Sequence, residues 1–221
     1  VAGTNAGNMT VRDATKQSMN VGFTEMLRQL DVCEVTRFAA SVGITKADGT
    51  PLDPEPSLAL GAHPVPPLGM ANVYATSGGK YCKPIAIESV LDASGTSMAV
   101  PSADCTQALE AKVADQTATT LQATSEPGGT AKDAAIGRPI AGKTGTTDEA
   151  ENAWFVGFTP QLSTAVWIGD AKESNKSLAG RTIGGRYFQR MYGSDLAVPM
   201  WRDYMSQALA NDPYLPIPSH S

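Results

Sequence analysis

Residues 137–147, GRPIAGKTGTT, support two kinds of chemistry, and both use Lys143. Counted from Gly137, the stretch has the spacing G-x-x-x-x-G-K-T of a loop whose backbone amides and lysine hold nucleotide phosphates. Counted from Lys143, it is Lys-Thr-Gly, a motif in which a lysine beside a reactive serine assists acyl transfer. The elements on either side of the stretch must decide between these interpretations.

A phosphate loop follows a buried strand and opens a helix, because the helix N-terminus supplies the amides that bind phosphate. Upstream lies EPGGTAKDAAI, which is no continuous apolar strand, and Pro139 lacks an amide proton. Downstream, TTDEAENAWFVGF predicts a turn and then a strand, although the later AVWIGD imitates the apolar run and aspartate that accompany such loops. The nucleotide hydrolase is therefore a distant alternative, which binding of ATP with magnesium would revive.

The residues around Lys143 instead favour a sheet. Three short segments rich in Val, Phe, Trp or Thr are bounded by turn residues, and this spacing predicts an antiparallel meander. The segments are 139–147 (PIAGKTGTT), 152–160 (NAWFVGFTP) and 162–170 (LSTAVWIGD). We expect Trp154, Phe155 and Phe158 to pack within this sheet, and Asp148, Glu149 and Glu151 to form a solvated turn.

The alternation of a strand assigns the motif residues to two faces. Lys143 and Gly145 share one face, and Thr144 and Thr146 share the other. Lys143 can then reach a cleft that Gly145 leaves unobstructed. The backbone of Thr146 is expected to bind an extended peptide as an added strand, or to donate to an oxyanion.

Helices are predicted before and after the sheet, which indicates an α+β fold with an antiparallel sheet packed against helices. Capping patterns begin the first two helical regions, and Gly43 ends the second. The expected helices cover about 10–30, 31–42, 68–76, 102–123 and 198–210. Between them, residues 48–69 contain six prolines and should be irregular, 81–95 should form a strand entering a turn, and 171–186 is a polar connection.

Ser18 and Asn20 form a second candidate pair, in the first helical region. Residues i and i+2 of a continuous helix do not share a face. If both side chains address one site, the chain must bend there and form a junction between two helices. Two polar residues on a solvated helix face are the alternative, which spacing alone favours.

Taken together, QSMN and AGKTGTTDEAENAWFVGFTP resemble the transpeptidase domain of penicillin-binding proteins. The segments PLGMANVYAT, GGKYCKP and VPMWRDYM are similar to the bifunctional, class A members. The resemblance covers about residues 10–210. It implies the fold of penicillin-binding proteins and serine β-lactamases, with 1–210 as the C-terminal portion of that domain and 211–221 as a proline-containing tail.

Members of that family are D,D-transpeptidases, in which a serine attacks the D-Ala-D-Ala bond of a peptidoglycan stem peptide and β-lactams acylate the same serine. By resemblance, Ser18 relays a proton to the leaving group, Asn20 binds the substrate amide, and Lys143 interacts with Ser18 and the substrate carboxylate. Thr144, Gly145 and Thr146 bind substrate, with the Thr146 amide as half of the oxyanion hole. No cofactor is implied.

The resemblance also implies a nucleophile in a Ser-x-x-Lys motif ahead of Ser-x-Asn. The sole literal match, Ser77-Gly-Gly-Lys80, follows it and contains two glycines that disfavour the helix this motif needs. We therefore expect the nucleophile, a membrane anchor and a glycosyltransferase domain upstream of this chain. The chain alone should not be acylated, and the protein should lie in the bacterial cell envelope.

Composition excludes other partners. A net charge of −5 gives no footprint for nucleic acid, and no run of 18 apolar residues predicts a membrane span within the chain. His63 and His220 are expected to be solvated, so neither a histidine triad nor a metal centre is predicted.

Of the three cysteines, Cys33 should pack as a small hydrophobe. If one pair is oxidised, Cys82 with Cys105 is the choice, and it would indicate an extracytoplasmic compartment.

Two other functions fit the same motifs. A carboxypeptidase or β-lactamase of this fold would use water in place of the acceptor amine. A non-catalytic penicillin-recognising sensor would form an acyl adduct without turnover, or none.

Overall fold

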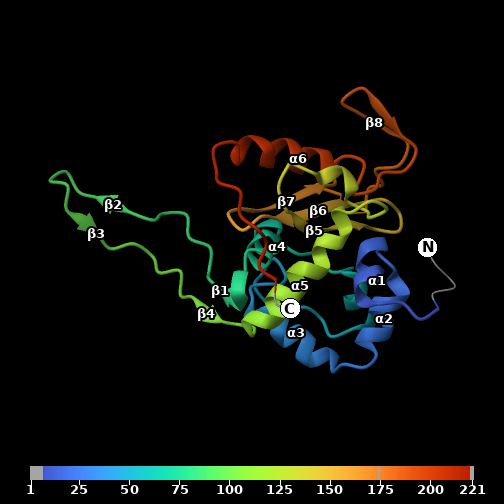
Figure 1. Cartoon of the computed structure of the whole chain (residues 1–221), viewed down its shortest axis with the longest axis horizontal. Helices are drawn as coiled ribbons and strands as arrows, with labels where there is room; N and C mark the ends of the chain where they lie inside the picture. Colours follow the sequence, from blue (N-terminus) through green and yellow to red (C-terminus); the bar gives the residue numbers. More distant parts are fainter. Residues whose placement is uncertain (1–6, 174, 220–221) are drawn as a thin grey trace.

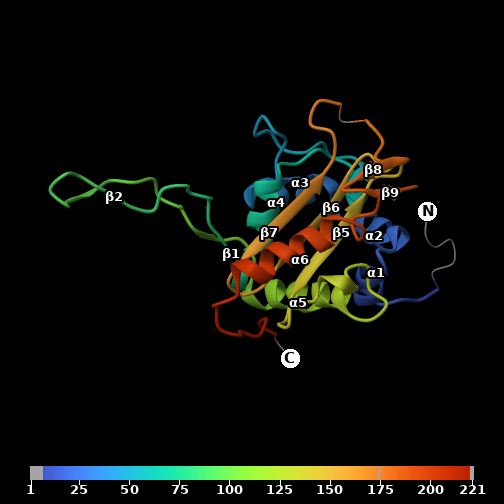
Figure 2. The ribbon, with the colours of Figure 1, turned by 90° about the horizontal axis from the view of Figure 1, so that it is seen from above.

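The computed structural model describes residues 7–173 and 175–219. Its centre is an antiparallel sheet in the order β5-β6-β7, with helices on either side (Figures 1 and 2). Helix α6 (Ala197–Ala208) covers one face, and α4 (Pro67–Tyr74) contacts β6 and β7 from the opposite face, while α5 (Ala111–Gln122) runs beside β5. The α+β fold is thus confirmed. The strands are β5 (Ala141–Thr146), β6 (Ala153–Phe158) and β7 (Ser163–Ile168).

The predicted meander and its alternation are confirmed by the strand register. Lys143 lies opposite Val156, and Gly145 lies opposite Trp154, which in turn faces Trp167 on β7. Aromatic and β-branched residues suit these paired positions because their side chains pack against cross-strand neighbours. The sheet therefore presents β5 as an edge strand with its motif residues in the predicted alternation.

The main core lies between the sheet and α6. Trp201 is fully buried and packs edge-on against Phe155, with 5.2 Å between the ring centroids. Its Nε1 donates to the Gly157 carbonyl at 3.1 Å, and a Cβ at Gly157 would come within 2.9 Å of the indole ring. Glycine at 157 thus allows the strand and the helix to approach closely.

The opposite face of the sheet rests on α4. Tyr74 packs edge-on against Phe158 at 6.1 Å, and the Ser163 hydroxyl donates to the Ala71 carbonyl at 2.7 Å. Burial raises the pKa of the Tyr74 phenol to about 12. The α4 contact therefore covers the end of the sheet that lies away from the turn between β5 and β6.

The N-terminal region forms three helices instead of two. Thr10 caps the first by accepting from the Asp13 amide, and Asp31 caps the third by accepting from the amides of Cys33 and Glu34. The helices are α1 (Val11–Gln17), α2 (Asn20–Leu27) and α3 (Val32–Ser41). The proline-rich stretch that follows is irregular apart from the short turn η1 (Pro56–Leu60), as predicted.

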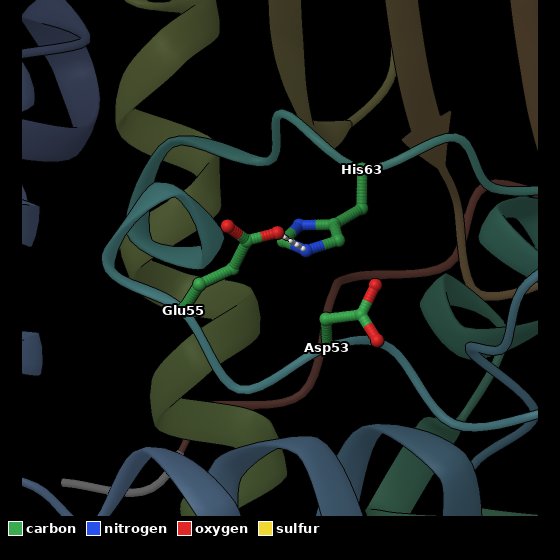
Figure 3. A group of neighbouring side chains, drawn as sticks. All are labelled: Asp53, Glu55 and His63. Carbon is green, nitrogen blue, oxygen red and sulfur yellow. Dashed lines mark hydrogen bonds and ion pairs between the residues drawn. The ribbon is translucent and has the colours of Figure 1, made fainter.

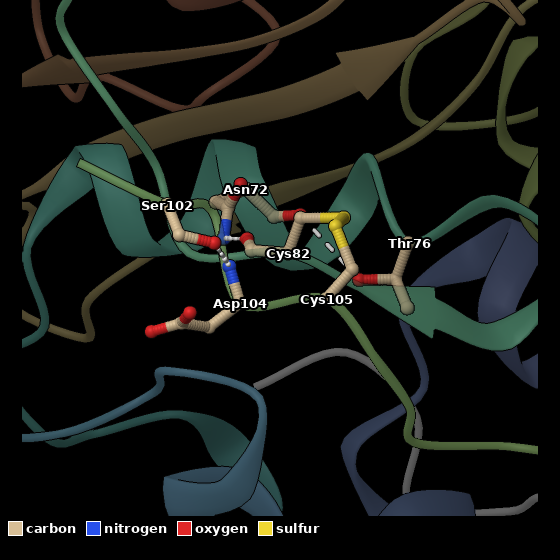
Figure 4. Close-up of a disulfide and its surroundings, with 6 residues drawn as sticks. All are labelled: Asn72, Thr76, Cys82, Ser102, Asp104 and Cys105. Atoms are coloured by element: carbon tan, nitrogen blue, oxygen red, sulfur yellow. Dashed lines mark hydrogen bonds between the residues drawn. A yellow bond between two sulfur atoms is a disulfide. The ribbon is translucent and has the colours of Figure 1, made fainter. Parts of the chain in front are cut away.

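Two predicted elements are wrong. Residues 81–95 do not form one strand, and the helix expected from 102 begins only at Ala111. The chain instead leaves and re-enters the body as a long hairpin, because Cys82 and Cys105 are joined in a disulfide and hold its two limbs together (Figure 4). Its paired segments are β1 (Lys80–Tyr81), β2 (Val90–Leu91), β3 (Ser97–Met98) and β4 (Thr106–Gln107).

Other details also differ from expectation. The polar connection contains a small hairpin, β8 (Arg181–Ile183) and β9 (Arg186–Phe188), turning at two glycines with positive φ. Cys33 is exposed rather than packed in the core.

The residues beyond α6 lie against the body, since Arg138 donates to the Leu209, Asp212 and Pro213 carbonyls. In the part of the chain that the structure describes, no helix has the length and apolarity to cross a membrane.

Replacing Trp201 tests the core assignment. Trp201→Ala should lower the free energy of unfolding by about 3–5 kcal/mol, because it leaves a large cavity beside Phe155. Tyr204→Ala is the matched control, since Tyr204 lies on the same helix and is 53% exposed. Urea unfolding followed by circular dichroism measures both. Equal losses for the two variants would contradict the assignment.

Candidate active site

Ser18 sits at a bend between α1 and α2. It has φ 55° and ψ 50°, a left-handed conformation that is uncommon for a residue other than glycine. The Ser18 amide donates to the Thr15 carbonyl, and the Met19 amide donates to the Ala14 carbonyl, which closes α1. Asn20 then begins α2. The predicted junction at Ser18-x-Asn20 is thus confirmed, and a solvated face of one continuous helix is excluded.

Lys143 brings the two sequence motifs together. Its Nζ donates to Ser18 Oγ at 2.7 Å and to the Thr144 carbonyl at 2.9 Å. Within the described residues, Lys143 forms no ion pair, and burial lowers the pKa of its ammonium group to about 8. The lowered pKa increases the share of neutral amine near neutral pH. This arrangement can pass a proton between a hydroxyl and an amine.

The outer edge of β5 carries the backbone groups of alternate residues. The Gly142 carbonyl accepts from the buried Thr124 hydroxyl at 2.9 Å, and the Thr144 carbonyl accepts from Lys143. In an antiparallel pair, backbone groups of successive residues point alternately toward and away from the partner strand. We infer that the Thr146 amide points toward the same outer edge, away from β6.

The other motif residues have distinct surroundings. The Thr144 hydroxyl donates to Thr130 Oγ1 at 2.8 Å, and Thr146 Oγ1 accepts from the Gly193 amide at 3.0 Å. A Cβ at Gly145 would lie 3.2 Å from the Trp154 Cβ, so this glycine also relieves packing against β6. The Asn20 side chain forms no hydrogen bond with described residues and is free for a ligand amide.

Sequence reasoning missed the segment that joins the two motifs, residues 124–131, which we call the brace. Its Glu126 forms ion pairs with Arg12 and Lys16 on α1, and its Thr130 amide donates to the Lys16 carbonyl at 3.2 Å. On its other side, Thr124 and Thr130 contact β5 as described. The signal that the sequence offers here is Pro127-Gly128-Gly129, which disfavours a helix and marks the end of the one predicted at 102–123.

The chain is similar to known proteins in sequence and in fold. The model of the penicillin binding protein transpeptidase domain matches residues 2–192. The chain belongs to that family. A penicillin-binding protein 1A of Aquifex aeolicus is 33% identical over 202 residues, covering 90% of this chain and 26% of the relative. A protein of the same name from Mycolicibacterium smegmatis is 30% identical over 230 residues, covering 95% and 28%. The resemblance to class A members is thus confirmed.

Solved structures support the fold of this transpeptidase-family chain. The crystal structure of penicillin-binding protein 1A from Haemophilus influenzae gives a TM-score of 0.78 at 24% identity, covering 96% of this chain and 36% of that one. A D,D-transpeptidase domain from Eggerthella lenta gives 0.66 at 21% identity, covering 94% and 55%. The chain spans about a quarter of the length of the relatives it matches.

The literal Ser-x-x-Lys match of this transpeptidase-family chain does not begin a helix. Ser77–Gly79 form a short 3-10 turn in which Gly78 and Gly79 have positive φ, and Lys80 opens β1. A helix is what would stack a serine and a lysine three residues apart on one face. The expectation that the two glycines disfavour the helix needed by this motif is confirmed.

One expectation about histidine is wrong. His63 is not solvated, because its side chain is only 8% exposed and its Nε2 lies 3.1 Å from Glu55 Oε1 (Figure 3). Asp53 completes a group with potential metal ligands, but Lys46 Nζ is 2.7 Å from its carboxylate and neutralises it. We assign no metal to this group. His220 lies outside the described residues.

Removing the Thr124 hydroxyl tests the brace of this transpeptidase domain. Thr124→Val should lower the free energy of unfolding by about 1–3 kcal/mol, since it leaves the Gly142 carbonyl without its buried donor. Thr124→Ser should restore most of the loss. Thr117→Val is the matched control, because the exposed Thr117 hydroxyl donates only to the Val113 carbonyl within α5. Chemical denaturation measures all three. If valine at 124 and at 117 had equal effects, the brace would carry no special role.

Proposed function

We propose that this chain is part of a serine-type D,D-transpeptidase that cross-links peptidoglycan stem peptides at D-Ala-D-Ala through an acyl-enzyme, and that β-lactams inhibit it. The nucleophile would be the serine of a Ser-x-x-Lys segment outside residues 1–221. The contact of 2.7 Å between Lys143 Nζ and Ser18 Oγ carries the proposal. It joins two motifs 125 residues apart at the open edge of a sheet, where an acyl-transfer site needs both.

In the first step, the nucleophilic serine oxygen attacks the carbonyl carbon between the two D-alanines, and its proton passes through Ser18 to the neutral amine of Lys143. The negative charge on the carbonyl oxygen is stabilised by the Thr146 amide, which the alternation of β5 directs to the outer edge. The carbon–nitrogen bond then breaks and D-Ala leaves as an amine, which takes a proton relayed by Ser18 from Lys143. The pKa of Lys143, lowered to about 8 by burial, suits both loss and gain of a proton near neutral pH.

In the second step, the amine of a neighbouring stem peptide attacks the acyl ester, and its proton passes through Lys143 and Ser18 to the serine oxygen as the ester bond breaks. Among the described residues the amide groups of Asn20 have no partner, so they are available to bind the peptide backbone. The lysine charge and the Thr144 and Thr146 region would bind the terminal carboxylate of the donor. Gly145 keeps this surface free of a side chain. Covalent catalysis of this type divides one hard step into two easier ones.

The disulfide bond supports an extracytoplasmic location for the protein. The Cys82–Cys105 disulfide is typical of oxidising, extracytoplasmic compartments. We place the chain in the bacterial cell envelope, anchored to the membrane through a segment outside it. Residues 1–210 would be the C-terminal portion of the transpeptidase domain, and 211–221 its tail.

Lys143→Arg tests the proton relay, in a protein extended upstream to include the complete domain. Arginine keeps the charge but cannot lose it, so acylation by a β-lactam should fall on the order of 10²–10³-fold. The rise of the acylation rate through an apparent pKa near 8 should also disappear. Lys132→Arg, at an exposed position, is the matched control. An unchanged rate and pH profile in the Lys143 variant would remove this lysine from the mechanism.

The intact mass of the protein after incubation with a β-lactam tests the proposed function itself. A penicilloyl increment on the extended protein, and none on residues 1–221 alone, is the expected result. An increment on the short chain would mean that its own serine is the nucleophile. No increment on either would favour a binding module. Release of the increment by water alone, without an acceptor amine, would favour a carboxypeptidase or β-lactamase.

A further inference from the structure

Residues 82–105, here called the arm, project away from the body of the molecule (Figures 1 and 2). At the base, the Cys82–Cys105 disulfide joins the limbs, Lys83 N donates to the Ala103 carbonyl at 2.7 Å, and the Lys83 and Asp104 side chains form an ion pair at 2.9 Å. The Asn72 side chain donates to the Cys82 carbonyl and ties the base to α4 (Figure 4). The arm therefore begins from a fixed point.

The tip of the arm is also well defined. The Asp92 carboxylate accepts hydrogen bonds from the Ser94 and Thr96 amides, and β2 pairs with β3 beside this turn. The Ser94 hydroxyl and these amides lower the pKa of Asp92, so the turn keeps its charged acceptor at neutral pH. A side chain that bonds the backbone two residues ahead is a strong turn former.

Between base and tip, the two limbs are extended but not paired. The backbone of 84–89 and of 99–102 forms no hydrogen bond with any described residue. Ile85 and Ile87 follow the period of a strand, and Leu91 continues the same face four residues on. These side chains are 38%, 52% and 63% exposed. A row of apolar side chains beside unpaired backbone groups is a template for another strand.

We propose that the arm binds a β-strand contributed by another part of the same polypeptide, outside residues 1–221. That strand would pair with the backbone of 84–89 and cover Ile85, Ile87 and Leu91. The added strand would form hydrogen bonds with the unpaired backbone groups of the arm and would bury apolar surface. These two effects stabilise β-strand addition.

The size of the apolar row favours a partner in the same polypeptide. A stable complex between separate proteins buries about 1,200–2,000 Å² in total, which three side chains on a narrow ribbon do not supply. A segment linked to the arm binds at an effective concentration in the millimolar range, so a small contact is enough. The relatives are about four times as long as the matched region, and they therefore contain ample chain for such a segment.

Two measurements on the full-length protein test the proposal. Hydrogen exchange at residues 85–89 should be slowed by about tenfold or more relative to an unstructured peptide, because the added strand protects these amides. Ile87→Asp should abolish the protection, whereas Ala93→Asp at the exposed tip should not. A photo-reactive phenylalanine derivative at position 87 should cross-link to a segment of the same polypeptide outside residues 1–221, and the same probe at position 93 should not.

Three outcomes would overturn the proposal. The amides of 85–89 could exchange at the rate of an unstructured peptide. The probe at position 87 could join two copies of the protein in a concentration-dependent way, or it could join the arm to a different protein. Penicilloylation of the same samples reports separately on the proposed function, because the arm is remote from Ser18 and Lys143 in sequence and carries none of the motif residues.

Discussion

The buried hydrogen bond from the Thr124 hydroxyl to the Gly142 carbonyl is the contact on which the site depends most. Thr124 and Gly142 are both buried, and no strand formed by the described residues lies beyond the outer edge of β5. Without this donor the Gly142 carbonyl would be desolvated and unpaired, which costs more than an ordinary hydrogen bond contributes. The same brace contacts α1 through the ion pairs of Glu126 and the hydrogen bond of the Thr130 amide. One short segment thus sets the distance between Ser18 and Lys143.

The two residues held by the brace both occupy unfavourable states. Ser18 adopts a left-handed backbone conformation, and Lys143 loses hydration that its charged form prefers. Each state stabilises the other, because the bend at Ser18 brings its hydroxyl within hydrogen-bonding distance of the lysine. Strain and desolvation of this kind persist only where surrounding contacts fix the groups. The ion pairs of Glu126 and the core around Trp201 supply those contacts from two sides.

Local patterns predicted much of the fold. The three strands, α6 and the bend at Ser18 follow from residue alternation, turn residues and the i, i+2 spacing. The brace could not be predicted, because the value of Thr124 and Thr130 lies in partners on β5 that are distant in sequence. The arm was missed because its local sequence pattern predicts a different structure from the one that forms. Residues 102–110 have helical composition, but the disulfide and β4 hold them extended. His63 was misjudged because its burial comes from contacts across a proline-rich loop.

The edge of β5 is open at one end only, and this gives direction to any peptide that pairs with it. Near Gly142 the edge is covered by Thr124, and at Thr144 the carbonyl is already bound by Lys143. The brace does not cover the Thr146 end, and the Thr146 side chain is exposed. Under the proposed function, an extended peptide with its scissile carbonyl at the Thr146 amide would continue past the β5–β6 turn, because the carbonyls of Gly142 and Thr144 are already bound. The contact between Thr124 and Gly142 thus also leaves the Thr146 end of this edge as the end that a peptide can reach in the proposed function.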